Sequence, residues 1–205
     1  VVARLLRNRD LVTLEEIESF LKGKEEDCHS PYLLPDMEKA VSIIVGAIEE
    51  KQSIRIVGDY DVDGVTSTFI LLKGLKAMGA DVDYAIPNRV LDGYGVNENL
   101  IEQANNDKRN IIITCDNGIA AFDAFERAGK LGIKCIITDH HEVKFEDNGI
   151  SKEYIYPKAE AIVNPKRHDS KYPFKGICGA MVAYKLICAL GDKLDLDGNV
   201  KAELR

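Results

Sequence analysis

Short apolar runs alternate with longer helix-like segments through most of this sequence, and this alternation constrains the fold more than any other feature. The runs are rich in β-branched residues and show little polar alternation, which is typical of strands covered on both faces of a sheet. The expected strands are Ile54–Val57, Val82–Ile86, Ile111–Thr114, Cys135–Thr138 and Ala161–Val163, and the expected helices lie near residues 65–79, 97–106, 118–131 and 177–190. The pattern predicts an α/β fold with a mainly parallel five-stranded sheet and helices on both faces.

The residues before the first expected strand have the signals of short helices. Thr13-Leu-Glu-Glu16 has the form of a capping box, and the amphipathic stretch that it opens ends at Gly23. A polar stretch with prolines follows and is typical of a linker. Asp36 then stands where it would cap a second helix over residues 37–52.

Length and composition agree with one main domain in a soluble globular protein. The chain has 205 residues, of which 45% are hydrophobic and 30% are charged. No apolar run approaches the roughly 20 residues of a membrane span, and the first residues lack the apolar core of a signal peptide. We expect a helical lead and linker over residues 1–35, one main domain over residues 36–205, and no membrane partner.

The cysteines and the net charge bear on the compartment and on the partners. The five cysteines are odd in number and contain no C-x-x-C pair, so we expect reduced core residues in a cytoplasmic protein. The net charge of -7 argues weakly against non-specific binding of nucleic acid. Acidic metal ligands contribute to this charge, however, and bound cations would cancel part of it. The net charge therefore excludes little.

Polar clusters follow the ends of the expected strands. Three runs lead directly into polar sequences, GDYDVDG, CDNG and DHHE, and the other two are followed by PNR and NPKR. In parallel α/β sheets, ligands bind at the carboxyl ends of the strands. Because these ends share one edge of the sheet, we expect the clusters to converge there although they lie far apart in the sequence.

The first of these clusters contains three aspartates at alternate positions, Asp59, Asp61 and Asp63. Carboxylates so close together raise one another's pKa, and a cation between them is the usual means of keeping them ionised. The cluster therefore indicates a site for a hard divalent metal. An EF-hand calcium loop is excluded because its twelfth position would be Ile70, where the loop needs a glutamate, and because a strand-like run precedes it.

A second alternative is the nucleophile motif of haloacid-dehalogenase-type phosphatases, which the sequence DVDGV from Asp61 resembles, with Thr114 as a candidate for their second motif. In those enzymes the nucleophilic aspartate directly follows an apolar strand. Here the residues Gly58–Tyr60 stand between the strand and Asp61. The histidine pair described next is also unexplained by that family, so this interpretation is disfavoured.

Two later clusters offer further metal ligands. Asp116 in CDNG could simply cap a helix near Gly118, or it could bind a cation. Asp139 is followed by His140 and His141, two of the four histidines in the chain. An Asp-His-His run at a strand end places imidazole nitrogens beside carboxylates. This mixed ligand set points to manganese, with magnesium or zinc as less favoured occupants.

Basic, aromatic and glycine-rich stretches near the strand ends are candidates for binding a phosphate backbone. The NPKRHDSKYPFK stretch carries Tyr172 and Phe174 among its basic residues, which suits phosphates and stacked bases, although the stretch could equally be a solvated loop. Arg89 is a natural clamp for a phosphate. The glycines on either side of Tyr94 could equally serve only a tight turn.

Taken in order, the sequences GDYDVDG, PNR, DGYG, CDNGI, TDHH, NPKR and GICGAMVAYKL resemble those of the RecJ-type single-strand-specific exonucleases, a family within the DHH phosphoesterase superfamily. The resemblance runs from about Ile54 to Leu190. It implies a DHH-type catalytic domain that holds two divalent ions, typically manganese, with magnesium as a substitute.

The resemblance also implies a role for each matching residue. The implied metal ligands are Asp59, Asp61, Asp63, Asp116 and His140. Asp61 and Asp63 would bind one ion each. Asp116 would bridge the two ions, and His140 would complete the second site. The implied catalytic residues are Asp59, Asp116 and His141, with Asp139 orienting the imidazoles. The implied substrate contacts are Asn88, Arg89, Tyr94, His141, Lys166 and Arg167.

The activity implied by the resemblance is two-metal hydrolysis of phosphodiester bonds, as a 5′-to-3′ exonuclease on single-stranded DNA in repair and recombination. Implied partners are single-stranded DNA, a helicase and a single-strand-binding protein. Two alternatives keep the fold. A phosphatase for short oligonucleotides or nucleotides would share every metal ligand, whereas a metal-free scaffold protein in replication would have lost them. The intact metal-ligand residues argue against the scaffold.

The sequence departs from the superfamily pattern at two places. Val57 stands where some superfamily members have a histidine, and because RecJ-type sequences also vary here, the change favours RecJ over the inorganic-pyrophosphatase branch. The fourth acidic ligand of the family has no match, since Asp192, Asp195 and Asp197 lie in a loop-like stretch. We therefore expect a fragment that is truncated before the fourth motif and before a C-terminal DHHA1-type domain, with weak activity or none.

Overall fold

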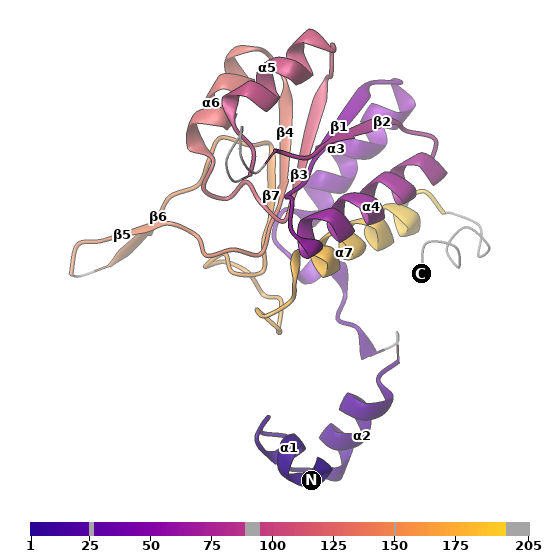
Figure 1. Ribbon diagram of the computed structural model, residues 1–205, viewed down its shortest axis with the longest axis vertical. Coiled ribbons are helices and arrows are strands. Elements are labelled where there is room, and N and C mark those ends of the chain that lie inside the picture. The colour runs from indigo at the N-terminus through magenta and orange to yellow at the C-terminus, as the bar shows by residue number, and fades with distance from the viewer. Residues whose placement is uncertain (25–26, 89–94, 150, 196–205) are drawn as a thin grey trace. The chain divides into compact units, whose positions relative to one another are not determined.

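The structure of the protein, a computed structural model, describes residues 1–24, 27–88, 95–149 and 151–195 (Figure 1). The chain forms two compact units, Val1–Ser30 and Pro31–Arg205. Among the described residues, no helix is both long enough and apolar enough to cross a membrane.

The first unit contains two short helices, α1 (Val2–Arg7) and α2 (Leu14–Lys22). The capping box expected at the start of α2 is confirmed. The Oγ1 atom of Thr13 accepts the backbone N–H of Glu16 at 3.2 Å, and the Glu16 carboxylate accepts the backbone N–H of Thr13 at 2.9 Å. Two N–H groups that a helix start leaves without partners are thereby paired.

The second unit contains one parallel sheet and the helices that cover it. Its elements are the 3₁₀ helix η2 (Pro31–Leu33), α3 (Met37–Glu49), β1 (Ser53–Val57), α4 (Val62–Ala77), β2 (Asp81–Ala85), α5 (Glu98–Asn106), β3 (Ile111–Cys115), α6 (Phe122–Lys130), β4 (Lys134–Thr138), β5 (Phe145–Asp147), β6 (Lys152–Tyr154), β7 (Ala161–Val163) and α7 (Gly179–Lys193). Five strands pair in the order β2-β1-β3-β4-β7, all parallel. This confirms the predicted five-stranded sheet.

Helices cover both faces of this sheet, which explains why the strand sequences lack polar alternation (Figure 1). In β3, Ile111 and Ile113 belong to the core formed with α3, α4 and α7. Ile112, between them, belongs to the core formed with α5 and α6. All three side chains are fully buried. The strand is therefore apolar on both sides.

The strand order also locates the ligand-binding edge. From β1 the chain moves outward to β2 on one side, and it then returns to β3 on the other side of β1. Such a reversal opens a crevice beyond the carboxyl ends of the two central strands, where ligands bind in open α/β sheets. The residues that follow β1 and β3 are the aspartate clusters identified in the sequence.

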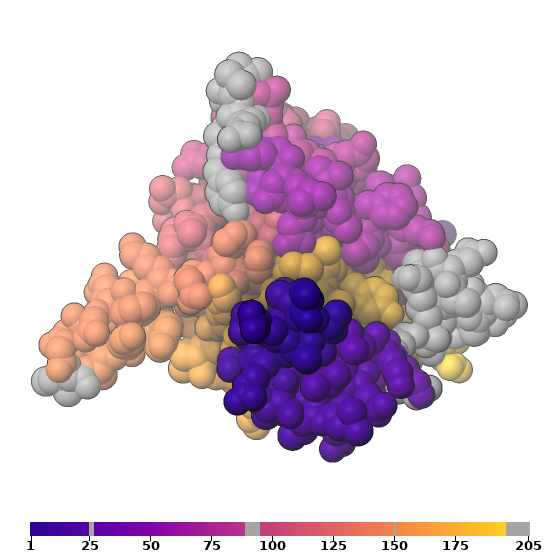
Figure 2. Space-filling model, turned by 60° about the horizontal axis from the view of Figure 1, so that its bottom comes forward, coloured from indigo at the N-terminus to yellow at the C-terminus, as the bar shows by residue number. Residues whose placement is uncertain are grey.

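Two elements differ from the sequence-based expectations. An antiparallel hairpin of β5 and β6 projects from the second unit (Figure 2) and was not predicted. Its strands are three residues each and largely exposed, so they have no apolar signal, although Asn148-Gly149 is a typical hairpin turn. Helix α6 begins at Phe122 instead of near residue 118, and the N–H of Ile119, before the helix, donates to Asp139.

Asp36 stands at the N-cap position of α3, as expected, but its side chain does not cap the helix. Its backbone is left-handed, with φ of 54°, and its side chain makes no capping hydrogen bond. The carboxylate instead accepts the N–H of Ile162 at 3.0 Å and a guanidinium N–H of Arg167 at 2.6 Å. These two hydrogen bonds connect the start of α3 to β7 and to the loop that follows β7. The bond from the charged guanidinium is the stronger of the two.

The cysteines are also only partly as expected. None of the five forms a disulfide, and Cys115 and Cys135 are buried in the core. Burial raises the pKa of both thiols to about 12. Cys28 and Cys178, however, are exposed, so the prediction of core residues is wrong for these two. Neither lies inside an apolar strand.

Candidate metal centre

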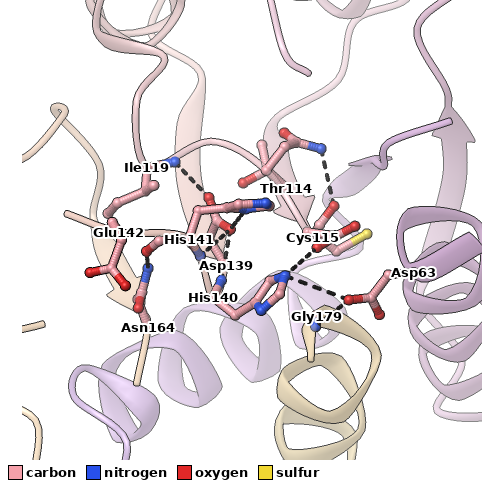
Figure 3. A network of polar contacts seen from close by, with 12 residues as sticks. Asp63, Thr114, Cys115, Ile119, Asp139, His140, His141, Glu142, Asn164 and Gly179 are labelled. Atoms are coloured by element: carbon pink, nitrogen blue, oxygen red, sulfur yellow. Dashed lines mark hydrogen bonds and ion pairs between the residues drawn. The ribbon is translucent and has the colours of Figure 1, made fainter. Parts of the chain in front are cut away.

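The carboxyl ends of β1, β3 and β4 bring the three acidic clusters to one edge of the sheet (Figure 3). Val57 at the end of β1 lies opposite Thr114 of β3, and Cys115 at the end of β3 lies opposite Thr138 of β4. The polar residues that follow these positions leave the sheet at the same level. The convergence expected from the sequence is therefore present.

The aspartates after β1 have three different environments. Asp59 is fully buried in the loop before α4. Asp61 is the N-cap of α4, and its side chain accepts the N–H of Gly64 at 2.9 Å. Asp63 lies in the first turn of α4, where its carboxylate accepts the N–H groups of Gly179 at 2.8 Å and Ala180 at 2.7 Å. Asp63 therefore contacts the start of α7.

Asp116 follows β3 in a left-handed conformation, with φ of 60°. Aspartate tolerates this region better than most residues, but at a cost of about 1–2 kcal/mol. Asp116 does not cap a helix, since α6 starts at Phe122 with Ala121 as its N-cap. Its own N–H donates to the carbonyl of Thr138 at 3.1 Å, and the residue is only 2% exposed. The capping interpretation is therefore excluded.

The carboxylate of Asp116 is poorly compensated. Burial, followed by the nearby charges of Asp63 and Asp61, raises its pKa to about 8. Its Oδ1 atom lies 3.0 Å from Nε2 of His140 but accepts no hydrogen bond from any described residue. A buried acceptor in this state is costly. A cation at this position would compensate it, so the residues fit a metal site.

The two histidines after β4 point in different directions (Figure 3). Nε2 of His140 lies 3.0 Å from Asp116 and 3.6 Å from Asp63. His141 instead turns to Asp139, with Nδ1 2.8 Å from the carboxylate. Asp139 also accepts the backbone N–H groups of both histidines. It therefore orients the ring of His141 but contacts His140 only through the backbone.

Asp139 stays ionised although it is 1% exposed. Burial alone would raise the pKa of Asp139, but hydrogen bonds from His141 and from the N–H of Ile119 outweigh burial and lower it. The same hydrogen bond with Asp139 raises the pKa of His141. The pair therefore favours a carboxylate beside an imidazolium.

Potential ligand atoms gather in two groups that share one residue. Atoms of Asp59, Asp61 and Asp116 lie within 4.8 Å of one another. Atoms of Asp116, His140 and His141 do the same. Asp63 belongs to neither group, but its Oδ2 atom, which accepts an N–H of α7, lies 3.6 Å from Nε2 of His140. Oxygen and imidazole ligands in this mixture suit manganese.

The residues predicted to contact substrate have mixed positions. Asn88 is exposed beyond the end of β2, whereas Arg89 and Tyr94 lie outside the described residues. The ammonium of Lys166 is 3.0 Å from Glu142, whose side chain is 82% exposed. Such surface pairs are weak, so Lys166 remains able to bind a phosphate.

Arg167 is held inside the fold. Its guanidinium donates to Asp36, to Asp169 and to the carbonyl of Ile162, and its side chain is 13% exposed. Because each of its nitrogens already has an acceptor, we do not retain Arg167 as a substrate contact. Tyr172 is 3% exposed and has no open ring face to stack on a base.

Two residues at this edge were not recognised in the sequence. Asn164, fully buried after β7, donates to the carbonyl of His141 at 3.0 Å and accepts the N–H of Lys166 at 2.7 Å. Gly179 begins α7 and contacts Asp63. Their signals were weak, since an asparagine after a strand and a glycine before a helix are both common in turns.

Comparison with known proteins places the fold in a family. Residues 53–203 match the DHH family, N-terminal domain. The chain is 41% identical over 190 residues to the single-stranded-DNA-specific exonuclease RecJ of Bacillus subtilis (strain 168), and the match covers 93% of this chain and 23% of that protein. RecJ of Escherichia coli (strain K12) is 36% identical, with 93% of this chain and 31% of that protein covered.

A solved structure agrees with these matches. A crystal structure of exonuclease RecJ bound to manganese has a TM-score of 0.68 and 31% identity, and covers 80% of this chain and 39% of that chain. This chain spans 23% and 31% of the length of the two curated relatives. Because the family match extends over most of the sequence, this protein belongs to the DHH family.

Proposed function

We propose that this chain carries the metal centre of a nuclease that removes nucleotides from the 5′ end of single-stranded DNA. The observation that carries the proposal is the convergence of two groups of ligand atoms that share Asp116. The 41% and 36% identity to RecJ exonucleases supports the substrate class. The direction of cleavage rests on the resemblance to the RecJ family alone.

The proposed cofactor is a pair of manganese ions, with magnesium as a substitute. The proposed ligands are Asp59, Asp61, Asp63, Asp116 and His140. Asp116 is proposed to bridge the ions because it belongs to both groups of ligand atoms. When bound, two such ions supply an activated water and neutralise the charge that develops on the phosphate.

The chain's own residues then have distinct tasks. His141, whose ring Asp139 orients through Nδ1, is proposed to donate through Nε2 to an oxygen of the scissile phosphate. Its raised pKa favours the charged form that such a donor needs. Asp59, which is fully buried, is proposed to assist at the first group of ligands, to which it belongs.

The proposed DNA contacts extend along the same edge of the sheet. Lys166 follows β7 and Asn88 follows β2, so the two lie beyond opposite ends of the strand order. Arg89 and Tyr94 remain proposals from the family resemblance. The same holds for a catalytic domain over residues 36–205 and for a helicase and a single-strand-binding protein as partners, whereas a cytoplasmic location is proposed from the cysteine pattern.

A nuclease assay tests the proposed activity. The protein is incubated with manganese and with single-stranded DNA labelled at either end. We expect mononucleotides released from the 5′ end, no cleavage of duplex DNA, and loss of activity on chelation. Activity confined to oligonucleotides of a few nucleotides would instead support the phosphatase alternative. Absence of metal binding would support the alternative of a metal-free scaffold protein.

A further inference from the structure

The first turn of α7 is capped by a residue from another helix. Cys178, the N-cap of α7, makes no side-chain capping hydrogen bond. The carboxylate of Asp63 accepts the N–H of Gly179 through Oδ2 and the N–H of Ala180 through Oδ1. Hydrogen bonds to an ionised carboxylate are stronger than those between neutral groups, and the positive end of the helix dipole favours a negative charge at the N-terminus. Both oxygens of Asp63 are thus fixed by backbone groups.

Gly179 also contacts Asp116. A Cβ atom at Gly179 would lie 2.6 Å from Oδ1 and 2.7 Å from Cβ of Asp116, closer than real Cβ contacts allow. One backbone position therefore touches two of the proposed ligands, Asp63 through an N–H and Asp116 through van der Waals contact. A larger residue at position 179 would have to displace the helix or the Asp116 carboxylate.

The helix has little freedom to move away. α7 packs against α4, the helix that carries Asp63, and against α3. At Gly74 of α4, an added Cβ would lie 2.5 Å from Cδ1 of Ile187 in α7, so the two helices are in close contact there. The buried residues of α7 include Leu186 and Leu190, both fully buried. Interiors packed in this way resist small displacements.

We propose that the first turn of α7 is a positioning element for the metal centre, which holds the Asp63 carboxylate beside Asp116 and requires glycine at position 179. The inference rests on the proposed metal-dependent function. It adds that metal affinity depends on a backbone contact from a helix that carries none of the proposed ligands. The N–H groups of Gly179 and Ala180 fix the orientation of the Asp63 carboxylate, whose Oδ2 atom lies 3.6 Å from Nε2 of His140.

The test measures manganese binding to this chain by electron paramagnetic resonance, which detects the free ion. We expect Gly179→Ala to raise the manganese dissociation constant at least tenfold. The matched control is Gly46→Ala in α3, where an added Cβ meets nothing within 4 Å. The control is expected to bind manganese within twofold of the unmodified chain. Melting temperatures without metal show whether each variant is folded.

A second measurement keeps the test decisive if Gly179→Ala does not fold. The unmodified chain is titrated with magnesium, and the chemical shifts of its backbone amides are measured by two-dimensional NMR. The Gly179 and Ala180 amides are expected to shift more than that of Leu190, because their acceptor becomes a metal ligand. Unmoved Gly179 and Ala180 amides in a chain that binds magnesium would mean that Asp63 takes no part in binding the ion.

The outcomes separate the two proposals. Unchanged manganese affinity of a folded Gly179→Ala variant would overturn the positioning role, and so would unmoved Gly179 and Ala180 amides in a chain that binds magnesium. Failure of the unmodified chain to bind either ion would overturn the proposed metal centre itself, and the positioning role with it.

Discussion

Nε2 of His140 lies 3.0 Å from Oδ1 of Asp116, although the two residues follow different strands. β3 and β4 are neighbours in the sheet, with Cys115 opposite Thr138, so their ends hold the two side chains together. The same imidazole nitrogen lies 3.6 Å from Asp63, which follows β1. Residues from three strand ends thus surround one point.

Asp116→Ala is expected to abolish binding at both proposed metal sites, because Asp116 is the residue that the two groups of ligand atoms share. Ion binding at 100 times the dissociation constant stabilises a protein by about 2.7 kcal/mol. The unmodified chain should show this gain as a higher melting temperature in manganese, and the variant should not. Asp123→Ala, at an exposed position in α6, is the control. Retention of one bound ion by Asp116→Ala would disprove the bridging role.

His140→Ala and His141→Ala are expected to have different effects. His140 faces Asp116 and Asp63, so its loss should weaken manganese binding at least tenfold. His141 is held by Asp139, so its loss should leave manganese affinity within about threefold but lower the turnover number about 100-fold or more. Calorimetry gives the affinities and a nuclease assay the turnover. An equal loss of affinity in both variants would place His141 among the ligands.

Lys166→Ala is expected to weaken binding of single-stranded DNA uniformly across sequences. Each phosphate contact on a single strand contributes about 0.7 to the slope of log affinity against log salt concentration. The variant should therefore show a slope smaller by about this amount in a fluorescence anisotropy titration. Lys130→Ala is the control, since Lys130 pairs with Glu126 on the surface of α6. Identical slopes for Lys166→Ala and the unmodified protein would remove Lys166 from the binding surface.

The sheet could be predicted because its signal is local and repeated. Each buried strand, such as Ile111–Cys115, needs apolar residues on both faces, and the pattern of polar sequence after each strand marks the shared edge. The β5–β6 hairpin has neither signal, since its strands are short and exposed. The side-chain cap expected of Asp36 is absent because its carboxylate accepts hydrogen bonds from Ile162 and Arg167, which lie far away in the sequence.

The ligand residues were recognisable by type and spacing, but their contacts were not. Nothing local to DVDG indicates that Asp63 accepts two N–H groups from α7, which is 116 residues away in the sequence. Likewise, Arg167 has the composition of a phosphate contact, and only the fold shows that Asp36 and Ile162 occupy its guanidinium. Long-range polar pairs of this kind leave no periodic signal in a sequence.

The internal role of Arg167 leads to a prediction about stability. Arg167→Ala removes the guanidinium that pairs with Asp36 and Asp169 and donates to the carbonyl of Ile162. Hydrogen bonds to charged groups contribute about 1.5–3 kcal/mol each when buried, and Asp169 is 45% exposed, which reduces its share. We expect the free energy of unfolding to fall by about 1–3 kcal/mol, while manganese affinity changes less than twofold.

The pH dependence of this loss tests its cause. Arg167 is the main reason that the pKa of Asp169 is lowered, so the pair stabilises the fold above the ordinary aspartate pKa of about 3.9. That stability disappears as the pH falls through the lower pKa of the folded state. The difference between Arg167→Ala and the unmodified chain in urea unfolding should therefore be largest near pH 7 and smaller near pH 3. Lys171→Ala, exposed in the same loop, should show neither effect. A difference that does not change with pH would mean that packing of the arginine side chain, and not its ion pair, accounts for the loss.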